Sequence, residues 1–482
     1  MKRYERYADE ISEQIRTQAL RPGERLPSVR QASASRSISP ATVFSAYYLL
    51  EDRGLIHARP RSGYYVNALS AASQPEPGVA PPAPQSTSVA ISELVFEVLG
   101  STRDLDVVPL GSAFPSPALF PLDKLARRLT PAMRQLDSRR LVEDLTLGDE
   151  RLRQQIGLRY AVEGTGVALD EIVITNGAME ALTLCLQAVT RPGDVVALES
   201  PTFYAALQAL ERLKLRAVEV ATHPRHGVDL GSLADVLQRH PVKACWFMPN
   251  FQNPLGSLMP EASKQAMVEL LARHEVPLIE DDVYGELYFG LRRPPPAKVF
   301  DKKGLVMHCS SFSKCLAPGY RVGWVAGGRF AQQIQRLKLM STLGTAIPSQ
   351  MALSDYLQRG GHERHMRQLR QALASQQALA LRLIAEHFPP GTRVTQPLGG
   401  YFLWVELPPQ VDALELHRLA LAQRISLAPG HLFSADRRFS HCVRLNYGHP
   451  GDGRFEAALK AVGELACVLC REGGQNRLYH QN

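Results

Sequence analysis

The residues from Cys309 to Trp324 combine one amine with several groups that bind anions. Lys314 follows the hydroxyl side chains of Ser311 and Ser313, and Arg321 comes seven residues after it. Hydroxyl and guanidinium groups bind phosphate, and a lysine amine forms a Schiff base with an aldehyde. Pyridoxal 5′-phosphate (PLP) is an aldehyde that carries a phosphate, so this stretch is a candidate site for it. For the Lys-Cys pair alone, a lysine in a surface loop is the simpler interpretation.

Two earlier stretches supply other groups that such a cofactor requires. Residues 276–284 predict a short buried strand that ends in acidic residues. A carboxylate at this place pairs with a protonated pyridine nitrogen, and Tyr284, three residues after Asp281, is a donor for the phenolic oxygen of the ring. Residues 246–256 predict another apolar strand, whose following loop offers Asn253 as a second donor. Each signal is weak alone, but their order along the chain is specific.

From about residue 105 to the C-terminus, the chain resembles the aspartate-aminotransferase-like PLP enzymes of fold type I. Further motifs that carry the resemblance are Thr-Asn-Gly-Ala-Met-Glu, Ser-Pro-Thr-Phe-Tyr and Cys-Val-Arg-Leu-Asn-Tyr. It implies that Lys314 forms the Schiff base with PLP, that Asp281 binds the pyridine nitrogen, and that Arg444 binds a substrate α-carboxylate through two hydrogen bonds. The resemblance assigns the other contacts to Asn253 and Tyr284 at the ring hydroxyl, Phe203 against the ring face, and Ala178, Met179, Ser311, Ser313 and Arg321 at the phosphate.

The bulk properties limit the class of protein. A chain of 482 residues is too long for one ordinary core and predicts two or more domains. Its content of 45% hydrophobic and 21% charged residues is typical of a globular protein. We find no apolar run of 18 residues and no signal peptide, so we expect a cytoplasmic protein without a membrane partner. Seven scattered cysteines favour a reducing compartment, and Cys467-x-x-Cys470 fits core packing better than a metal site.

The N-terminal residues carry a different pattern. The net charge of +8 favours an anionic partner without naming one. Apolar spacing predicts a helix over residues 4–20, a short helix that ends near residue 36, and a third helix over 40–53 that Ser39 caps. Residues 55–66 predict two short strands around a Pro-Arg-Ser-Gly tip. Three helices followed by a β-hairpin predict a winged helix-turn-helix.

Residues 1–67 resemble the DNA-binding domains of the GntR family. The motifs that carry the resemblance are Gly23-Glu-Arg-Leu-Pro-Ser-Val-Arg30, Ser39-Pro-Ala-Thr-Val43, Gly54-Leu-Ile and Arg61-Ser-Gly63. The resemblance implies that the third helix enters the major groove of double-stranded DNA and that the wing contacts phosphates or base edges. The residues expected at the DNA are Arg30, Ser39, Ala41, Thr42, Phe44, Arg61 and Gly63. A helix-turn-helix used for protein contacts is the alternative.

The remaining chain divides into a linker and a large domain. Residues 68–89 are rich in Ala, Ser and Pro, and we expect an extended, poorly ordered spacer that can reach a second protomer. Residues 91–99 predict an amphipathic helix that docks on the large domain. Over residues 90–482, strands alternate with helices, which predicts an α/β fold with a mainly parallel central sheet, the site at its carboxyl edge, and a small C-terminal α+β domain that carries Arg444.

Together, the two resemblances identify the chain as a member of the MocR-type (GabR-type) subfamily of GntR regulators. This implies a PLP-dependent transcriptional regulator, a head-to-tail homodimer that binds operator DNA and senses an amino acid or PLP itself. A working aminotransferase with an accessory DNA-binding domain remains an alternative, with Lys314 as general acid and base. The absence of tyrosine from residues 143–147 favours regulation, because many aminotransferases place one there. An inert scaffold, which would be colourless, is a third interpretation.

Overall fold

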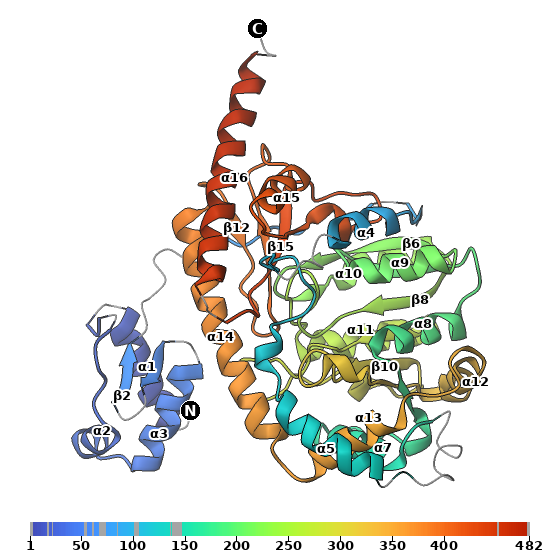
Figure 1. The fold of residues 1–482 in the computed structure, drawn as a ribbon, viewed down its shortest axis with the longest axis horizontal. Helices are drawn as coiled ribbons and strands as arrows, with labels where there is room; N and C mark the ends of the chain where they lie inside the picture. Colours follow the sequence, from blue (N-terminus) through green and yellow to red (C-terminus); the bar gives the residue numbers. More distant parts are fainter. Residues whose placement is uncertain are drawn as a thin grey trace.

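Two units make up the chain, a small N-terminal unit and a large α/β unit (Figure 1). The computed structural model describes residues 3–16, 19–21, 23–52, 55–59, 62–66, 74–83, 85–100, 106–134, 136, 147–450 and 453–479. Within these ranges, no helix has both the length and the apolar character needed to cross a membrane.

The N-terminal unit is a winged helix-turn-helix, as the sequence predicts. Its elements are α1 (Arg3–Arg16), α2 (Val29–Arg36), α3 (Pro40–Asp52) and the antiparallel pair β1 (Ile56–Arg59) and β2 (Gly63–Val66). Ser28 and Gln31 form a capping box at α2, and Ser39 Oγ accepts a hydrogen bond from the Thr42 N–H at 3.1 Å at the start of α3. The described part of the first helix spans residues 3–16, and residues 19 and 20, which the prediction includes, are not helical. Ile11, Val43 and Tyr47 belong to its separate core.

A nine-stranded sheet forms the centre of the large unit. Eight strands follow the order β3-β6-β5-β8-β9-β10-β11-β4, and β7 pairs with β6. The strands are β3 (Thr87–Ser88), β4 (Ile172–Thr175), β5 (Val195–Ser200), β6 (Arg216–His223), β7 (Gly227–Val228), β8 (Val242–Phe247), β9 (Leu278–Asp281), β10 (Val306–Ser311) and β11 (Gly323–Ala326). The five neighbouring strands β6, β5, β8, β9 and β10 run parallel, whereas β3, β4, β7 and β11 pair antiparallel to their neighbours. The expected mainly parallel sheet is therefore confirmed.

Helices cover both faces of this sheet because its strands are apolar on both sides. Along β5, Val196 and Leu198 pack in the cluster that contains residues of α8 (Ala178–Val189) and α9 (Tyr204–Arg212). Their neighbours Val195 and Ala197 pack on the other face against α10 (Leu230–Arg239) and α11 (Glu261–Arg273). This alternation is the two-residue period of a strand. Because the central strands run parallel, the loops that follow them lie at one edge of the sheet.

Helices at the periphery of the large domain join it to the small domain. They are α5 (Leu122–Arg134), α7 (Glu150–Val162), α12 (Ala331–Ser341), α13 (Ile347–Gln358) and α14 (His362–His387). The small domain contains β12 (Arg393–Val394), β13 (Phe402–Glu406), α15 (Ala413–Ala422), β14 (Ala428–Pro429), β15 (Cys442–Asn446) and α16 (Arg454–Tyr479). Its sheet has the order β12-β13-β15-β14, and Figure 1 shows α16 packed beside α14. Arg444 lies on β15 opposite Trp404 of β13.

The linker differs from the expected poorly ordered spacer. Its described part, residues 74–83 and 85–89, lies on the large unit, where Thr87 and Ser88 form β3 against β6. The Ser86 carbonyl accepts a hydrogen bond from Arg216 Nη2 at 2.6 Å. A proline-rich segment has carbonyls without internal partners, and these are available to arginine side chains and to a sheet edge. The predicted extended shape is confirmed for this part of the linker, but the prediction that it is poorly ordered is wrong here.

The helix after the linker docks as expected. It is α4 (Ser92–Gly100), and the buried side chains of Ile91, Val95 and Val98 lie in the same core cluster as α8 and α9. Glu211 Oε2 accepts hydrogen bonds from the backbone N–H groups of Ile91 and Ser92 at 2.9 and 3.0 Å. A carboxylate from another helix therefore caps the N-terminus of α4.

Candidate functional site

Lys314 lies three residues after the end of β10, at the edge of the sheet where the parallel strands end. Its Nζ donates a hydrogen bond to the Ala113 carbonyl at 2.8 Å and lies 3.6 Å from the centroid of the Phe114 ring. Desolvation by its surroundings lowers the pKa of Lys314 to about 7, and the positive charge of Arg444 adds to this effect. A large fraction of this amine is therefore neutral near pH 7 and able to act as a nucleophile.

Asp281 is the last residue of β9 and lies opposite Cys309 of β10. Its side chain is buried, and Oδ1 has no hydrogen-bond partner among the residues that the structure describes. Burial raises the pKa of Asp281 to about 7, and the charge of Asp282 raises it further, while a side-chain hydrogen bond with Trp246 and the charge of Lys314 oppose the shift. A buried oxygen without a partner is costly, so this position favours a bound donor.

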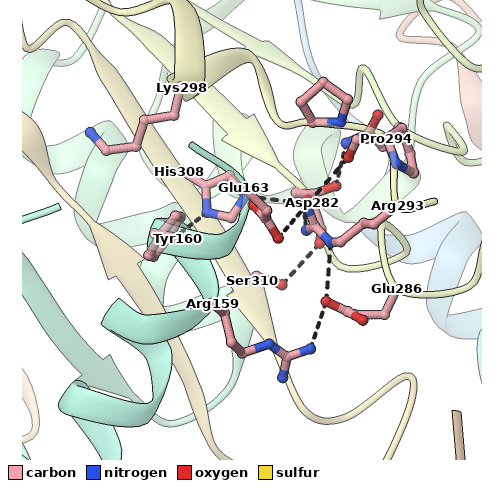
Figure 2. Close-up of polar contacts among 12 residues, drawn as sticks. Arg159, Tyr160, Glu163, Asp282, Glu286, Arg293, Pro294, Lys298, His308 and Ser310 are labelled. Atoms are coloured by element: carbon pink, nitrogen blue, oxygen red, sulfur yellow. Dashed lines mark hydrogen bonds and ion pairs between the residues drawn. The ribbon is translucent and has the colours of Figure 1, made fainter. Parts of the chain in front are cut away.

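The next residue, Asp282, has the opposite environment. Figure 2 shows it in a buried polar network, where it pairs with Arg293 and accepts from His308 Nε2 at 3.0 Å. Asn250 Nδ2 donates to its other oxygen at 2.9 Å. Although burial alone would raise it, the pKa of Asp282 lies well below its ordinary value because of Arg293 and His308. Asp282 is therefore an anion fixed by several partners.

This network extends far behind the site. Arg293 also pairs with Glu163 and Glu286 at 3.0 Å each, and Glu286 pairs with Arg159 at 2.6 Å (Figure 2). On the other side, the Tyr160 hydroxyl lies 2.6 Å from His308 Nδ1. Contacts from α7 and β10 therefore hold the turn after β9, which fixes the backbone that carries Asp281.

Arg444 is fully buried at the centre of β15. Its Nη1 donates to Asn253 Oδ1 at 3.1 Å, and its Nη2 donates to the Gly111 carbonyl at 2.6 Å. The guanidinium carbon lies 4.3 Å from the centroid of the Phe402 ring and 5.3 Å from that of Phe433. Arg444 Nε and Asn253 Nδ2 are buried donors for which the described part of the chain provides no acceptor. They suit a ligand that carries oxygen acceptors.

An anion cradle forms where α8 begins. Gly177 precedes the helix with φ of 83°, and an added Cβ would lie 2.3 Å from Arg321 Nη2. Arg321 Nη1 donates to Ser313 Oγ at 3.2 Å, and Ser311 Oγ accepts from the Ser313 N–H at 3.4 Å. The free N–H groups of the first turn of α8, starting at Ala178, complete a positive environment. Two hydroxyls, one guanidinium and one helix N-terminus therefore meet.

The predicted ring contacts are less closely joined to this cluster. Tyr284 is fully buried, its ring lies edge-on to those of Tyr401 and Phe402 at 5.4 and 5.6 Å, and burial raises its pKa. Phe203 is half-buried directly before α9 and packs with both large core clusters. Met179, 36% exposed, lies at the start of α8. None of the described contacts joins the side chain of Phe203 or that of Met179 to Lys314.

One part of the site is absent from the sequence-based prediction. Residues 111–114 lie across it, and their carbonyls bind Arg444, Lys314 and the Tyr401 hydroxyl, which donates to Ala113 at 3.0 Å. Asn446 Nδ2 donates to the carbonyls of Ser112 and Phe114 at 2.9 and 2.7 Å. The only signal is the glycine at 111, where an added Cβ would lie 2.5 Å from the Leu427 carbonyl carbon.

The residues expected at DNA lie on the separate N-terminal unit. Arg30, Ser39, Ala41 and Phe44 are exposed, and Thr42 is half-buried with its hydroxyl 2.8 Å from that of Ser39. The start of α3 therefore presents an open surface. Gly63 begins β2 with φ of 108°, and an added Cβ would lie 3.3 Å from Arg25 Nε. Arg61 lies outside the described residues.

Comparisons with known proteins agree with this division. Residues 3–66 match the family of bacterial regulatory proteins, gntR family, and residues 145–462 match the family aminotransferase class I and II. The HTH-type transcriptional regulator YdcR of Escherichia coli, uncharacterized, is 48% identical over 96% of this chain and 99% of its own length. The regulator YjiR of the same organism, also uncharacterized, is 37% identical over 96% and 98%.

Solved structures resemble the large unit. The kynurenine aminotransferase of Pyrococcus horikoshii, solved with PMP, aligns with a TM-score of 0.72 and 28% identity over 78% of this chain and 94% of its own. The α-aminoadipate aminotransferase LysN of Thermus thermophilus, complexed with N-(5′-phosphopyridoxyl)-L-leucine, aligns with a TM-score of 0.71 and 27% identity over 80% and 100%.

Fold and matches together define a DNA-binding regulator whose second domain has the fold of an aminotransferase. The chain belongs to the MocR-type subfamily of GntR transcriptional regulators. The cofactor of this second domain is PLP. Its residues fit PLP on three observations: the cradle at Gly177 for an anion, the unpaired Asp281 Oδ1 for a protonated nitrogen, and the unpaired Asn253 Nδ2 for an oxygen.

Proposed function

We propose that this protein regulates transcription by binding operator DNA through its N-terminal unit and sensing an amino acid, or PLP itself, in its aminotransferase-like domain. The observation that carries the proposal is the union of two features in one chain. The start of α3 presents exposed residues on a winged helix, and Lys314 lies beside a cluster in which Asp281, Asn253 and Arg444 each keep one buried polar atom without a partner among the described residues.

In this proposal Lys314 binds the cofactor aldehyde, and its lowered pKa provides the neutral amine that this requires. PLP supplies an electrophilic carbon and an electron-accepting ring. Asp281 accepts a hydrogen bond from the ring nitrogen, while Asn253 and Tyr284 contact the ring hydroxyl and Phe203 covers one ring face. The phosphate is held by Ala178, Met179, Ser311, Ser313 and Arg321.

Arg444 is the residue we propose for the α-carboxylate of an amino acid. Its guanidinium is fully buried among aromatic rings and keeps its Nε donor for a ligand. A carboxylate there would compete with the Gly111 carbonyl for Nη2. The contact would therefore change the position of residues 111–114 or of the small domain, and such a difference between two conformations is what allows a ligand to shift DNA binding.

At the DNA, the N-terminal part of α3 with Ser39, Ala41, Thr42 and Phe44 would enter the major groove, and Arg30, Arg61 and Gly63 would lie near the backbone or base edges. We further propose a head-to-tail homodimer, because two copies of the winged helix would read two half-sites. Because its proposed partner is chromosomal DNA, we also propose a cytoplasmic location. The domain boundaries we propose are residues 1–67, 68–89 and 90–482.

The test combines absorbance with a mobility shift. The full-length protein is titrated with PLP, and its binding to DNA from upstream of its own gene is measured with and without PLP and a panel of amino acids. We expect a visible absorption band that Lys314→Ala lacks, and a DNA affinity that changes when an amino acid is added. A colourless protein would overturn the cofactor role, and a DNA affinity indifferent to every ligand would overturn the sensing role.

A working aminotransferase remains the second candidate. The observation in its favour is that Lys314, with a pKa of about 7, is suited to accept and return a proton near neutral pH. Product analysis on the same samples decides between the two. A keto acid formed catalytically, in amounts that exceed the protein, would establish turnover. An amount no greater than one equivalent would leave sensing as the function.

A further inference from the structure

The described part of the linker, residues 74–83 and 85–88, contacts both domains of the aminotransferase-like unit. We call it the linker strap. On the large domain, Glu76 forms an ion pair with Arg225, which lies between β6 and β7, and residues 87–88 extend the central sheet at β6. The Ser86 carbonyl accepts from Arg216 at the start of β6. This end of the strap is therefore anchored to the large domain.

The same strap contacts the small domain at two places. The backbone N–H of Val394, on β12, donates to the Pro75 carbonyl at 3.1 Å. Arg438, in the loop before β15, donates from Nη1 to the Pro81 carbonyl. Arg438 also pairs with Glu219 of β6, so the strap, the small domain and the large domain meet at this one side chain. A shift of one domain relative to the other would therefore strain the contacts that the strap makes at Pro75 and Pro81.

A continuous path of packed side chains joins Arg438, where the strap contacts the small domain, to Arg444 in the ligand site. Arg444 lies opposite Trp404 in the small sheet, and its guanidinium carbon is 5.3 Å from the Phe433 ring centroid. The ring of Trp404 lies edge-on to Phe433 at 5.4 Å and to Phe439 at 5.8 Å, and Phe439 follows Arg438 directly. Packed aromatic rings transmit a displacement because they are nearly incompressible.

The junction also leaves room for movement. A cleft of about 270 Å³ lies between the strap at residues 77–80, the large domain at Pro201 and Leu255, and the small domain at Trp404 and Phe439. Because the three parts are separated here by open space, the small domain can approach the strap without breaking a packed core. Closure of domains across such a junction is a common switching movement.

The covalent connection makes the strap relevant to DNA binding. Only residues 67–73 separate Val66, the end of β2, from the first described residue of the strap. Seven residues span at most about 25 Å. A displacement or release of the strap near Pro75 therefore changes where the winged helix can reach.

We propose that the linker strap transmits ligand binding to the DNA-binding unit: a carboxylate bound at Arg444 moves the small domain, and the contacts at Pro75 and Pro81 carry that movement to the start of the linker. This inference rests on the proposed function, because it assumes that the site binds an amino acid. It assigns a regulatory role to a segment whose composition predicts only a spacer.

The first experiment exchanges the charges of one strap contact in the full-length protein. Glu76→Arg breaks the ion pair with Arg225, and the double variant Glu76→Arg/Arg225→Glu restores it with reversed polarity. Glu97→Arg, which makes the same charge change at an exposed position of α4, is the control. The ligand-induced change in operator affinity is measured by mobility shift, and ligand binding is measured by the absorbance of the cofactor.

The ligand is expected to change operator affinity 5- to 150-fold in the native protein, as allosteric coupling typically does. Because an ion pair with a largely exposed arginine contributes modestly, we expect Glu76→Arg to lower this coupling factor by about two- to fivefold and the double variant to recover it. Ligand binding should stay within about twofold in every variant, and Glu97→Arg should behave as the native protein. An unchanged response in Glu76→Arg, or a double variant that fails to recover, would overturn the proposal.

The second experiment needs no DNA. Hydrogen exchange of the native protein is followed with PLP alone and with the N-(5′-phosphopyridoxyl) adducts of L-alanine, L-leucine and L-glutamate. We expect adduct binding to change the exchange of the Val394 amide and of the amides within residues 76–83, while β5 stays constant. If the adducts bound but hydrogen exchange in the strap did not change, the proposed role of the strap would be overturned and the proposed function would still stand. Failure of every adduct to bind would overturn the role of the strap and the amino-acid part of the proposed function, and would leave PLP itself as the ligand to be sensed.

Discussion

Asp281 and Asp282 are neighbours at the end of β9, yet their carboxylates have opposite environments. Asp282 is held by Arg293, His308 and Asn250, whereas Asp281 Oδ1 has no partner among the described residues. The fixed charge of Asp282 also raises the pKa of Asp281. The buried network therefore does two things: it positions the turn, and it prepares Asp281 to share a proton with a bound cationic group.

A first prediction concerns the stability of the cofactor-free protein. The pKa of Asp281 rises from 3.8 to about 7 in the folded state. The folded protein thus keeps a proton that the unfolded chain releases in this window, so the free energy of unfolding falls as the pH rises from about 4 to about 7. Asp281→Asn should remove the contribution of this residue to the fall, while Glu163 and Glu199, whose pKa values are also raised by burial, keep theirs. The variant should be more stable at pH 8 by on the order of a few kcal/mol. Urea unfolding between pH 4 and 8 measures the effect.

The control for this measurement is Asp235→Asn, at an exposed carboxylate of α10. We expect its pH dependence to match that of the native protein. If the native protein and Asp281→Asn showed the same profile, Asp281 would not carry a raised pKa.

The rate of cofactor attachment gives a second prediction. Because the pKa of Lys314 lies near 7 rather than at 10.5, the neutral amine forms as the pH rises through 7. The rate at which the PLP absorption band appears should therefore increase with a midpoint near pH 7, and Lys314→Ala should show no band. Stopped-flow absorbance from pH 6 to 10 records this dependence. A midpoint close to 10 would contradict the assigned environment of Lys314.

The cradle at α8 leads to a third prediction. Gly177→Ala places a Cβ against Arg321, whereas Gly164→Ala, at the same φ of 83°, meets no atom within 4 Å. Both variants place an alanine at positive φ, and Gly177, with ψ of 172°, lies in a region that glycine alone adopts readily, so folding of both variants is checked first. Only Gly177→Ala should also weaken PLP binding, by at least about tenfold, because Arg321 must move. Equilibrium titration with PLP compares the two variants, and equal PLP affinities would show that the cradle does not hold the phosphate.

Arg444 provides a fourth prediction. Arg444→Ala should keep the cofactor absorption but weaken binding of an amino acid by at least about 30-fold, which corresponds to about 2 kcal/mol for a buried charged contact. Arg444→Lys keeps the charge but loses the planar guanidinium group. Its affinity for the amino acid should lie between those of the native protein and Arg444→Ala. Spectral titration of the PLP-loaded proteins measures these affinities, and Arg418→Ala, at an exposed position of α15, is the control. Full amino-acid affinity in both Arg444 variants would place the carboxylate elsewhere.

The winged helix supplies a fifth prediction. Arg30 is exposed in the first turn of α2. If it contacts a phosphate, Arg30→Ala should weaken binding of all DNA sequences to a similar degree and lower the slope of log affinity against log salt by about one. Lys243→Ala, an exposed position of β8, should leave both quantities unchanged. A loss confined to one DNA sequence would instead indicate that Arg30 contacts a base.

Local pattern was enough to predict much of the fold. The strand β4, which begins with three apolar residues, and the helix α8 were recognisable from local sequence pattern, since strands and helices have their own repeat lengths. The cap at Ser39 and the hairpin after α3 were readable from residue types with strong local preferences. The parallel character of the sheet followed from the alternation of strands and helices.

Local pattern failed where a partner distant in sequence decides the outcome. A proline-rich composition predicts an unstructured spacer, but Arg216 and Arg225 are more than a hundred residues away from the strap contacts they make. Likewise, nothing in residues 111–114 indicates a carbonyl for Arg444, which lies over three hundred residues later. Such contacts depend on which loops the fold brings to one edge of the sheet.

By itself, the sequence determined the two domain classes, the PLP chemistry and the candidate residues of the site, because these depend on residue types in local order. The tertiary structure alone decided the opposite environments of Asp281 and Asp282, the unpaired atoms around Arg444, and the seat of the linker strap across two domains. The physical reason is that burial, charge pairing and desolvation are set by neighbours in space, and these neighbours come from segments that the chain keeps far apart.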